Sequence, residues 1–235
     1  MKIGAIIFSR ISSTRLPGKA LIDINGKTLI ERVIKRSKLI KSVNHICIST
    51  SRNSEDDIIE DIGRKNGLEV FRGSLNDVVL RAYDTAKYYQ YDSFLRLCGD
   101  RPFFDGKIYD QLITSHIKNN NDLTTNIFPR SVPPGLTGEI IKTNALEKCI
   151  IKTNDPIDRE HVTRFMYSNP SNFLIQNITC FNDKDKINLR LVIDDKLDLD
   201  RARWIAENIT ETNNDFQTNK IIELAKKWES KKKTN

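Results

Sequence analysis

The chain has 235 residues, of which 38% are apolar and 29% charged, enough to build the packed core of one large α/β domain. No stretch approaches the roughly 20 uncharged apolar residues of a membrane helix, and residues 1–8 meet Ser9 and Arg10 before any cleavage-type segment. We therefore expect a cytoplasmic protein that does not contact a membrane. The four cysteines and three histidines are scattered, so we expect reduced thiols and no zinc site.

The net charge is +7, but residues 226–233 hold five lysines and one glutamate, so most of the excess charge lies at the C-terminal end. Lysines this dense repel one another and favour an extended, solvated segment. We expect residues 226–235 to form a flexible basic tail. The rest of the chain carries little excess charge, which argues against a nucleic-acid partner.

Short apolar runs and helix-start patterns alternate over the first half of the chain. Three stretches, 28–31, 54–57 and 74–77, have the spacing of a capping box, which closes the first turn of a helix. Strands separated by about 10–15 helical residues imply right-handed βαβ units, and therefore an α/β fold with a mostly parallel sheet flanked by helices. The expected strands are 3–8, 45–49, 70–71 and 93–98, and the expected helices are 28–39, 54–67, 74–88 and 107–118.

The pattern changes after residue 118. We interpret residues 120–187 as a lobe inserted into a single domain that spans residues 1–225. Alternating apolar and polar residues over 189–193 predict a strand that returns to the sheet, and a last helix carries Trp204. Within the lobe we expect a turn at 119–121, a loop at 129–138, a strand at 137–142, helices at 144–152 and 155–167, and extended chain at 173–180.

The loop at 9–19 directly follows the first expected strand and carries several hydroxyls, a glycine and three cations, Arg10, Arg15 and Lys19. Ligands of α/β sheets bind at the carboxyl ends of the strands, and guanidinium, ammonium and backbone N–H groups together suit a polyphosphate. The alternative is a polar surface loop with a basic bias. Neither a complete P-loop nor a GxGxxG motif follows the strand, which weakens a kinase or dehydrogenase function.

Two aspartates follow expected strands: Asp100 comes after 93–98 and Asp194 after 189–193. If both strands are parallel members of one sheet, both carboxylates lie at the same edge as the 9–19 loop. Magnesium takes one or two carboxylates, and phosphate and water oxygens complete its shell. The pair therefore predicts a magnesium–nucleotide site, and the alternative is that both aspartates only cap the turns that follow them.

Residues 13–19 together with 23–27 resemble the signature loop of the 3-deoxy-manno-octulosonate (Kdo) cytidylyltransferases. Over residues 2–205 the better match is the spore-coat polysaccharide cytidylyltransferase-like family, which is related to the Kdo and acylneuraminate cytidylyltransferases. Each motif is weak alone, but the ordered set is specific. The motifs are Glu55–Asp57, Phe71–Ser74 with Asp77 and Val78, Gly99 and Asp100 with Pro102 and Asp105, Gly135 and Leu136 with Glu139, Arg159–Thr163, and Val192–Asp194 with Asp198 and Leu199.

The resemblance implies a Rossmann-like nucleotide-diphospho-sugar transferase fold. The implied reaction converts CTP and a sugar acid, or a related sugar, into a CMP-sugar and pyrophosphate for surface polysaccharide or glycan biosynthesis. Attack on the α-phosphorus needs positioning and charge neutralisation rather than a protein nucleophile, which fits a chain without a Ser-His-Asp set. The lobe would meet the acceptor or the second copy of a homodimer, which its apolar residues Phe165, Met166, Phe173, Leu174 and Ile175 also favour.

Carried onto this sequence residue by residue, the resemblance implies Mg²⁺ held by Asp100 and Asp194, with catalytic roles for Arg15, Lys19 and Asp100. The implied nucleotide-binding residues are Ser9, Arg10, Ser12, Ser13, Arg15, Lys19, Thr50, Ser51, Gly73 and Ser74. The implied substrate-binding residues are Arg101, Gly135, Glu139, Glu160 and His161.

The chain departs from the family pattern at Arg101, where a smaller or acidic residue is expected, and at Asp195–Leu197, which replace Thr-Pro-Glu. Arg101 either contacts an anion near the sugar or pairs with Asp105. His161 is either a general base or a structural histidine in a lobe or dimer contact. A transferase that uses another nucleoside triphosphate and a nucleotide-binding protein without catalysis are the alternative functions.

Overall fold

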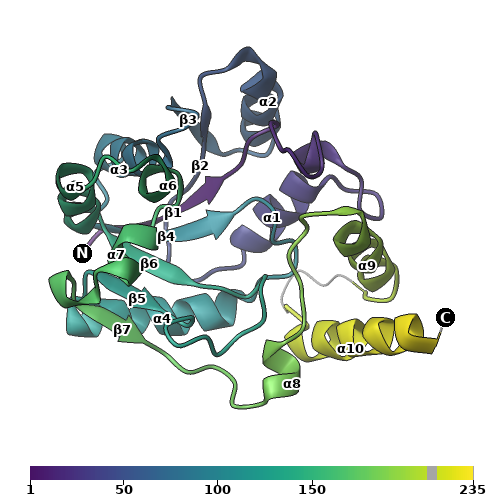
Figure 1. Ribbon diagram of the computed structural model, residues 1–235. Coiled ribbons are helices and arrows are strands. Elements are labelled where there is room, and N and C mark those ends of the chain that lie inside the picture. Colours follow the sequence, from purple (N-terminus) through teal and green to yellow (C-terminus); the bar gives the residue numbers. More distant parts are fainter. Residues whose placement is uncertain (211–215, 235) are drawn as a thin grey trace.

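The structure is a computed structural model that describes residues 1–210 and 216–234, with side chains through residue 231. Seven strands form one sheet in the order β3-β2-β1-β4-β6-β5-β7 (Figure 1). All neighbouring pairs are parallel except those of β6, which runs antiparallel to β4 and β5. The strands are β1 (Ile3–Phe8), β2 (Ile46–Ser51), β3 (Glu69–Gly73), β4 (Ser93–Cys98), β5 (Leu123–Thr125), β6 (Glu139–Lys142) and β7 (Ile175–Asn177).

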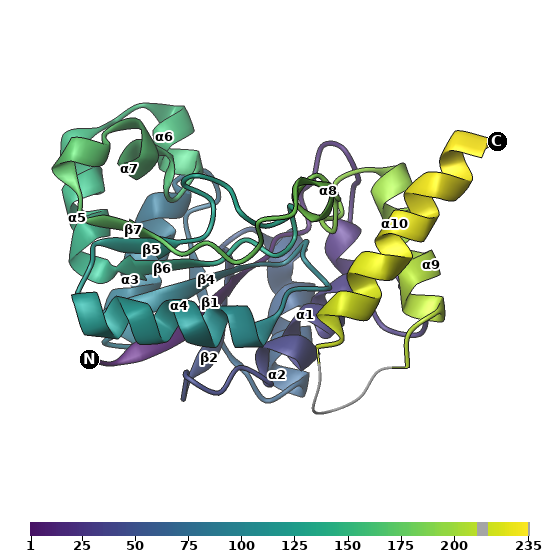
Figure 2. The ribbon, with the colours of Figure 1, turned by 90° about the horizontal axis from the view of Figure 1, so that it is seen from below.

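Helices cover both faces of the sheet (Figure 2), and each face has its own apolar core. Side chains of a strand point alternately to opposite faces, so in β1 Ala5 and Ile7 enter one core and Ile6 enters the other. The first core is covered by α1 (Leu29–Ser37), α2 (Asp57–Lys65), α4 (Gly106–Asn119), α9 (Lys196–Glu207) and α10 (Thr218–Thr234). The second is covered by α3 (Val78–Tyr88), α5 (Thr143–Lys152) and α7 (Arg164–Ser168), with the short α6 (Pro156–Glu160) beside them. The predicted α/β fold is confirmed.

The three expected helix starts differ in outcome. Thr28 and Glu31 form the predicted capping box at the start of α1. The stretch 54–57 does not: it begins with a 3-10 turn (Ser54–Asp56), and the buried Asp56 side chain leaves the helix to accept hydrogen bonds from the backbone of Ile11 and Ser51. At the third start Asp77, rather than Ser74, caps α3 by accepting from the backbone N–H of Leu80.

The segment expected as an inserted lobe is continuous with the sheet. Strand β6 pairs directly with β4, and β5 and β7 extend the sheet beyond it. The expected single helix over 155–167 is two short helices, α6 and α7, separated at residues 161–163. The strands of this segment share the hydrogen-bond ladder of the first half of the chain, so the segment is built onto the sheet within one domain.

Residues 189–193 do not form the expected strand. They run as extended chain held by two backbone bonds, from Leu191 N–H to the Pro134 carbonyl (2.7 Å) and from Ile193 N–H to the Asp100 carbonyl (3.0 Å). The segment therefore reaches the β4 end of the sheet without joining the ladder, and α8 (Lys184–Ile187) precedes it.

The C-terminal stretch does not form the expected extended tail. Helix α10 continues to Thr234, and the Trp228 ring lies 5.8 Å from the Trp204 ring of α9. Lys231 lies over the same Trp204 ring at 4.9 Å. The lysines of this stretch thus extend from a helix whose earlier turns bury Ile221, Ile222 and Leu224. Among the described helices none is both long and apolar enough to span a membrane.

Candidate active site

A cavity of about 370 Å³ opens at the carboxyl ends of β1 and β4, and the 9–19 loop forms much of its wall. We call it the loop cavity. Most of the cations and hydroxyls expected from the sequence face it, together with α3 and the end of α6. Its lining is Phe8, Ser9, Arg10, Ser12–Arg15, Lys19, Ala20, Val78, Arg81, Arg96, Cys98–Asp100, Glu160, His161 and Asp194.

Two contacts fix the 9–19 loop over the sheet. Asp56 accepts from the Ile11 backbone N–H at 2.7 Å, which ties the loop to the end of β2. Gly99 packs against the first residues of the loop, and a Cβ at this position would lie 2.9 Å from the Phe8 carbonyl oxygen. Only glycine permits this close approach, so the β4 end and the loop form one wall of the cavity.

Asp100 and Asp194 converge on one cation. The Lys19 ammonium lies 3.1 Å from Asp100 Oδ2 and 3.2 Å from Asp194 Oδ1. Arg15, at 2.9 Å, and Arg190, at 2.7 Å, also pair with Asp194. The conclusion that both carboxylates meet beside the loop therefore agrees with the structure, although its premise, two parallel strands, is wrong for residues 189–193.

This pair of carboxylates fits a divalent cation. The two side chains present oxygens to a common point, and the second oxygen of Asp100 is buried without a hydrogen bond. Magnesium prefers such oxygen ligands and commonly takes only one or two carboxylates from the protein. The described residues contain no cluster of three or more metal-ligating side chains, so phosphate and water oxygens would complete the shell.

Unpaired polar atoms gather in this cavity. Six buried side-chain nitrogen or oxygen atoms of the described residues have no hydrogen-bond partner, and four of them belong to residues that line the loop cavity. Buried polar groups are normally paired, so this concentration indicates a site built for a polar ligand. The four atoms are Ser12 Oγ, Arg81 Nε, Arg96 Nε and Asp100 Oδ1.

The sequence reasoning missed Arg81. This side chain is only 3% exposed and lies across the end of β3, where its Nη1 donates to the Ser74 carbonyl at 2.6 Å. Burial, and then the nearby positive charge of Arg10, lower the pKa of the Arg81 guanidinium to about 10. Gly73 makes room for it, since a Cβ there would lie 2.8 Å from Arg81 Cγ. The only sequence signal was the i, i+3 spacing of Val78 and Arg81 on the first turns of α3.

Some expected ligand residues lie elsewhere. Thr50 and Ser51 are fully buried at the end of β2, and neither they nor Gly73 and Ser74 belong to the cavity lining. Gly135 also lies outside, since it packs with φ +108° against the backbone of Leu191. Close packing and the positive φ therefore explain why position 135 is a glycine.

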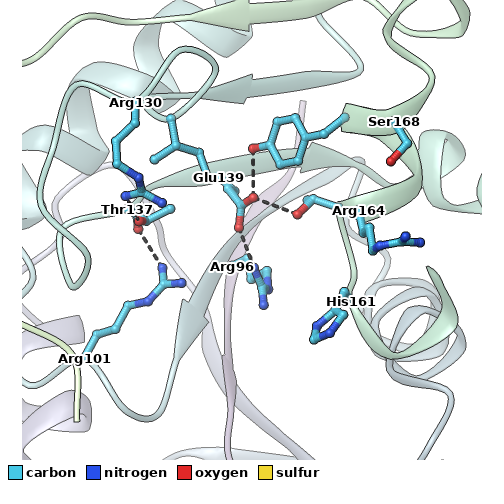
Figure 3. A pocket seen from close by; sticks show the side chains of 11 residues that line it. Arg96, Arg101, Arg130, Thr137, Glu139, His161, Arg164 and Ser168 are labelled. Carbon is cyan, nitrogen blue, oxygen red and sulfur yellow. Dashed lines mark hydrogen bonds and ion pairs between the residues drawn. The ribbon is translucent and has the colours of Figure 1, made fainter. Parts of the chain in front are cut away.

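A second cavity, also of about 370 Å³, adjoins the first and contains four arginines (Figure 3). We call it the arginine cavity. Figure 3 shows the Glu139 carboxylate at its centre, with Arg101 and Arg130 on one side and His161 and Arg164 on the other. Its lining is Arg96, Arg101, Ile127, Arg130, Thr137, Glu139, His161, Thr163, Arg164, Tyr167 and Ser168, of which Arg96 and His161 also line the loop cavity.

Glu139 organises the arginine cavity. It is 1% exposed, pairs with Arg96 at 2.5 Å, and accepts hydrogen bonds from the hydroxyls of Thr163 (2.8 Å) and Tyr167 (2.9 Å). Burial alone would raise the pKa of the Glu139 carboxyl, but the positive charges of Arg96 and Arg101 hold it below its usual value. Glu139 is therefore a buried anion that fixes cations around it.

Arg164 pairs with Asp158 through its Nη1, whereas Arg101 and Arg130 are less compensated. Arg101 donates to the Thr137 carbonyl at 3.0 Å, and its Nε lies 4.0 Å from Asp100. The alternative pairing with Asp105 is wrong, because Asp105 instead caps α4. Arg130 forms no ion pair within the described chain, and burial, followed by the charge of Arg101, lowers its pKa. The cavity therefore carries excess positive charge.

Glu160 and His161 lie where α6 ends. Glu160 faces the loop cavity and is 3.5 Å from Arg10. His161 is exposed and lines both cavities, and its ring makes no hydrogen bond within the described chain. This placement favours a contact with a ligand over a structural role.

Comparison with known proteins agrees with this site. The family model described as "Cytidylyltransferase" matches residues 4–225. The spore coat polysaccharide biosynthesis protein SpsF of Bacillus subtilis is 29% identical over 93% of this chain and 92% of its own. The 3-deoxy-manno-octulosonate cytidylyltransferase of Parabacteroides distasonis is 26% identical over 66% of this chain and 61% of its own.

Among solved structures, a cytidylyltransferase from Leptospira borgpetersenii superposes with a TM-score of 0.90 at 32% identity, over 98% of this chain and 96% of that one. The family match covers nearly the whole chain and includes every residue that lines the two cavities. The chain belongs to the cytidylyltransferase family and is a nucleotidyltransferase.

Proposed function

We propose that this enzyme transfers CMP from CTP to a sugar acid or a related sugar and releases pyrophosphate. The observation that carries the proposal is the pair of adjoining cavities. One joins cations to two convergent aspartates, and the other holds four arginines, of which Arg130 forms no ion pair within the described chain. A donor nucleotide in the first and an anionic acceptor in the second would meet where the cavities join.

The loop cavity has two chemically different ends. Arg15, Lys19, Asp100 and Asp194 suit a triphosphate with Mg²⁺, which when bound would neutralise phosphate charge. Arg81 extends from α3 to the end of β3, a strand whose axis lies about 14 Å from that of β4 because three strand spacings separate the two. With the apolar side chains of Phe8 and Val78, that end suits the ribose and the base.

Between these ends, the serine hydroxyls and Arg10 of the loop would hold the phosphates and position the α-phosphorus for in-line attack by an acceptor hydroxyl. The hydroxyl oxygen forms a bond to phosphorus, the bond to pyrophosphate breaks with its electron pair, and the hydroxyl proton passes to the His161 imidazole or to water. His161 faces both cavities and would lie beside that hydroxyl.

The arginine cavity favours an acceptor that carries a carboxylate. Arg130 forms no ion pair within the described chain, and Arg101 has only a long one, 4.0 Å from its Nε to Asp100. Arginine is suited to bidentate recognition of a carboxylate. Two of the relatives are named for spore coat polysaccharide biosynthesis and for 3-deoxy-manno-octulosonate, which supports a role in surface polysaccharide or glycan synthesis. The reaction would take place in the cytoplasm, where CTP is available.

We also propose a homodimer through the segment 120–185. The apolar residues of the segment are the sequence-based reason to expect this dimer. Two of them, Met166 and Phe173, are buried within the chain and are not available for a dimer contact. Four large apolar side chains of this segment nevertheless stay exposed, namely Phe128, Ile151, Ile157 and Leu174. Light scattering at micromolar concentration would give twice the chain mass for a dimer, and a monomer mass would refute this assembly.

The experiment for the proposed function measures pyrophosphate release. The enzyme with Mg²⁺ is mixed with CTP, UTP or GTP and a panel of sugar acids that includes 3-deoxy-manno-octulosonate. We expect release that needs both CTP and one acceptor. Faster release with UTP or GTP would favour another nucleotide specificity, and binding of CTP without release across the panel would favour a nucleotide-binding protein without catalysis.

A further inference from the structure

Arg96 is the cation at the junction of the two cavities. It extends from β4, and among the cationic side chains that line either cavity it alone lines both. Arg10, Arg15, Lys19 and Arg81 line only the loop cavity. Arg101, Arg130 and Arg164 line only the arginine cavity.

The transferred phosphorus must lie at such a junction. In a nucleotidyl transfer the α-phosphorus belongs to the donor and receives a bond from the acceptor, so it sits between their binding sites. A side chain that lines both sites is therefore placed to touch the phosphorus centre. Arg96 meets this requirement. Side chains two residues apart in a strand share a face, so Arg96 lies on the same face as Cys98, which also lines the loop cavity and is followed two residues later by Asp100.

The contacts of Arg96 leave donors free. Its Nη1 pairs with Glu139 Oε2, whereas its Nε is buried and has no hydrogen-bond partner. The other Glu139 oxygen, Oε1, is occupied by the hydroxyls of Thr163 and Tyr167. Contacts on both oxygens orient the carboxylate, and its bond to Nη1 orients the guanidinium while Arg96 Nε stays without a partner.

We propose that Arg96 is a catalytic residue that donates hydrogen bonds to a non-bridging oxygen of the α-phosphate, and that Glu139 is its positioning residue. This inference rests on the proposed function. Negative charge grows on those oxygens as the acceptor oxygen bonds to phosphorus and pyrophosphate departs. A fixed, partly buried guanidinium stabilises that charge without reorganising during the reaction.

The first experiment needs no acceptor. CTP and Mg²⁺ are bound to the wild type and to the Arg96→Lys and Arg96→Met variants, and ³¹P NMR records the three phosphate resonances. Arg101→Lys is the matched control, since it changes an arginine of the neighbouring cavity in the same way. We expect the α-phosphate resonance of bound CTP to move in both Arg96 variants and to stay in place in the control.

The second experiment measures turnover with the acceptor that the pyrophosphate panel identifies. We expect kcat to fall about 100- to 1,000-fold in Arg96→Met, with the Kd of CTP changed by less than about threefold. Glu139→Gln should lower kcat by about tenfold with KM values unchanged, because it loosens Arg96 without removing it. Arg96→Met leaves the buried Glu139 charge unpaired. If this single variant therefore fails to fold, the Arg96→Met/Glu139→Gln double variant, which has no buried charge at position 139, replaces it in the experiment.

The outcomes separate the two proposals. A wild type that does not bind CTP would refute the proposed function. A wild type that binds CTP, with an α-phosphate resonance that does not move in the Arg96 variants, would overturn the role of Arg96 and leave the function standing. A rise in the acceptor KM with kcat unchanged would also overturn it, since Arg96 would then bind only the acceptor.

Discussion

The loop cavity and the arginine cavity are both rich in cations, but their charges are balanced differently. In the loop cavity Lys19 and Arg15 are paired with Asp100 or Asp194. In the arginine cavity the buried carboxylate of Glu139 pairs with Arg96, and Arg130 forms no ion pair within the described chain. The first arrangement can exchange a protein cation for a metal ion, whereas the second retains excess positive charge for a ligand. Cation content alone therefore does not distinguish a metal–phosphate site from an anion site.

The largest effect should come from removing the aspartates. We expect Asp100→Ala and Asp194→Ala each to lower turnover by about 1,000-fold or more, since a two-carboxylate magnesium site loses several kcal/mol of transition-state stabilisation with either ligand. Circular dichroism should show an unchanged fold. Near-normal turnover of either variant at moderate magnesium would refute the metal assignment.

Next in size is the loss of acceptor arginines. We expect Arg101→Met and Arg130→Met each to raise the acceptor KM about 10- to 100-fold, the effect of losing one charge-assisted hydrogen bond. The Kd of CTP, measured by calorimetry, should stay unchanged because neither side chain lines the loop cavity. An equal weakening of CTP binding would show that the two cavities do not act separately.

A smaller effect is expected on the free energy of unfolding, from the buried side chain of His116. His116 is buried beneath β4 and β5, between the Ser93 and Thr124 hydroxyls, and burial lowers its pKa to about 4. The unfolded chain therefore binds a proton near pH 6.5 that the folded chain refuses until about pH 4, so stability falls as the pH falls through this window.

Between pH 7 and pH 5 we expect a loss of about 2 kcal/mol in the free energy of unfolding from His116. Urea denaturation at the two pH values measures it, with His116→Gln as the variant that should lack this contribution. The same pH dependence in wild type and variant would contradict the assignment.

The smallest effect should follow removal of residues 226–235. Turnover with CTP should stay within about twofold, while loss of the Trp204–Trp228 contact should cost about 1 kcal/mol of stability. Turnover of the full-length and truncated proteins is compared at low and at physiological salt, because physiological salt screens long-range charge effects. A large loss that persists at high salt would show that the ion pairs from Glu229 through Arg201 to Asp198 support the neighbouring Asp194.

Features set by nearby residues were predictable from the sequence. The Thr28–Glu31 capping box and the strands β1 and β4 depend on residues within one element, and they form as expected. The stretch 54–57 had the spacing of a capping box, but its Asp56 side chain accepts from the backbone N–H of Ile11, 45 residues away. A partner so distant in sequence leaves no local pattern that could reveal the choice.

Some residues of the candidate site were likewise predictable from their sequence neighbours, and others were not. The 9–19 loop and Asp100 stand out because chemistry-bearing residues directly follow strands. Arg81 and Arg96 were missed because each lies within an element, Arg81 in the first turns of α3 and Arg96 among the apolar residues of β4, and not in a loop after a strand. The partner of Arg96, Glu139, lies 43 residues away on a strand that pairs with β4 in the folded sheet only.

The close packing of Gly135 against Leu191 matters for redesigning acceptor specificity. The loop at 129–138 carries Arg130 into the arginine cavity, so it is an obvious place to introduce changes. The same loop holds residues 189–193 through Pro134, and that segment carries Asp194. A library that varies Pro134 or Gly135 would displace Asp194, the proposed metal ligand, together with the proposed acceptor contacts. Diversification that spares these two positions keeps the chemistry of transfer independent of the choice of sugar.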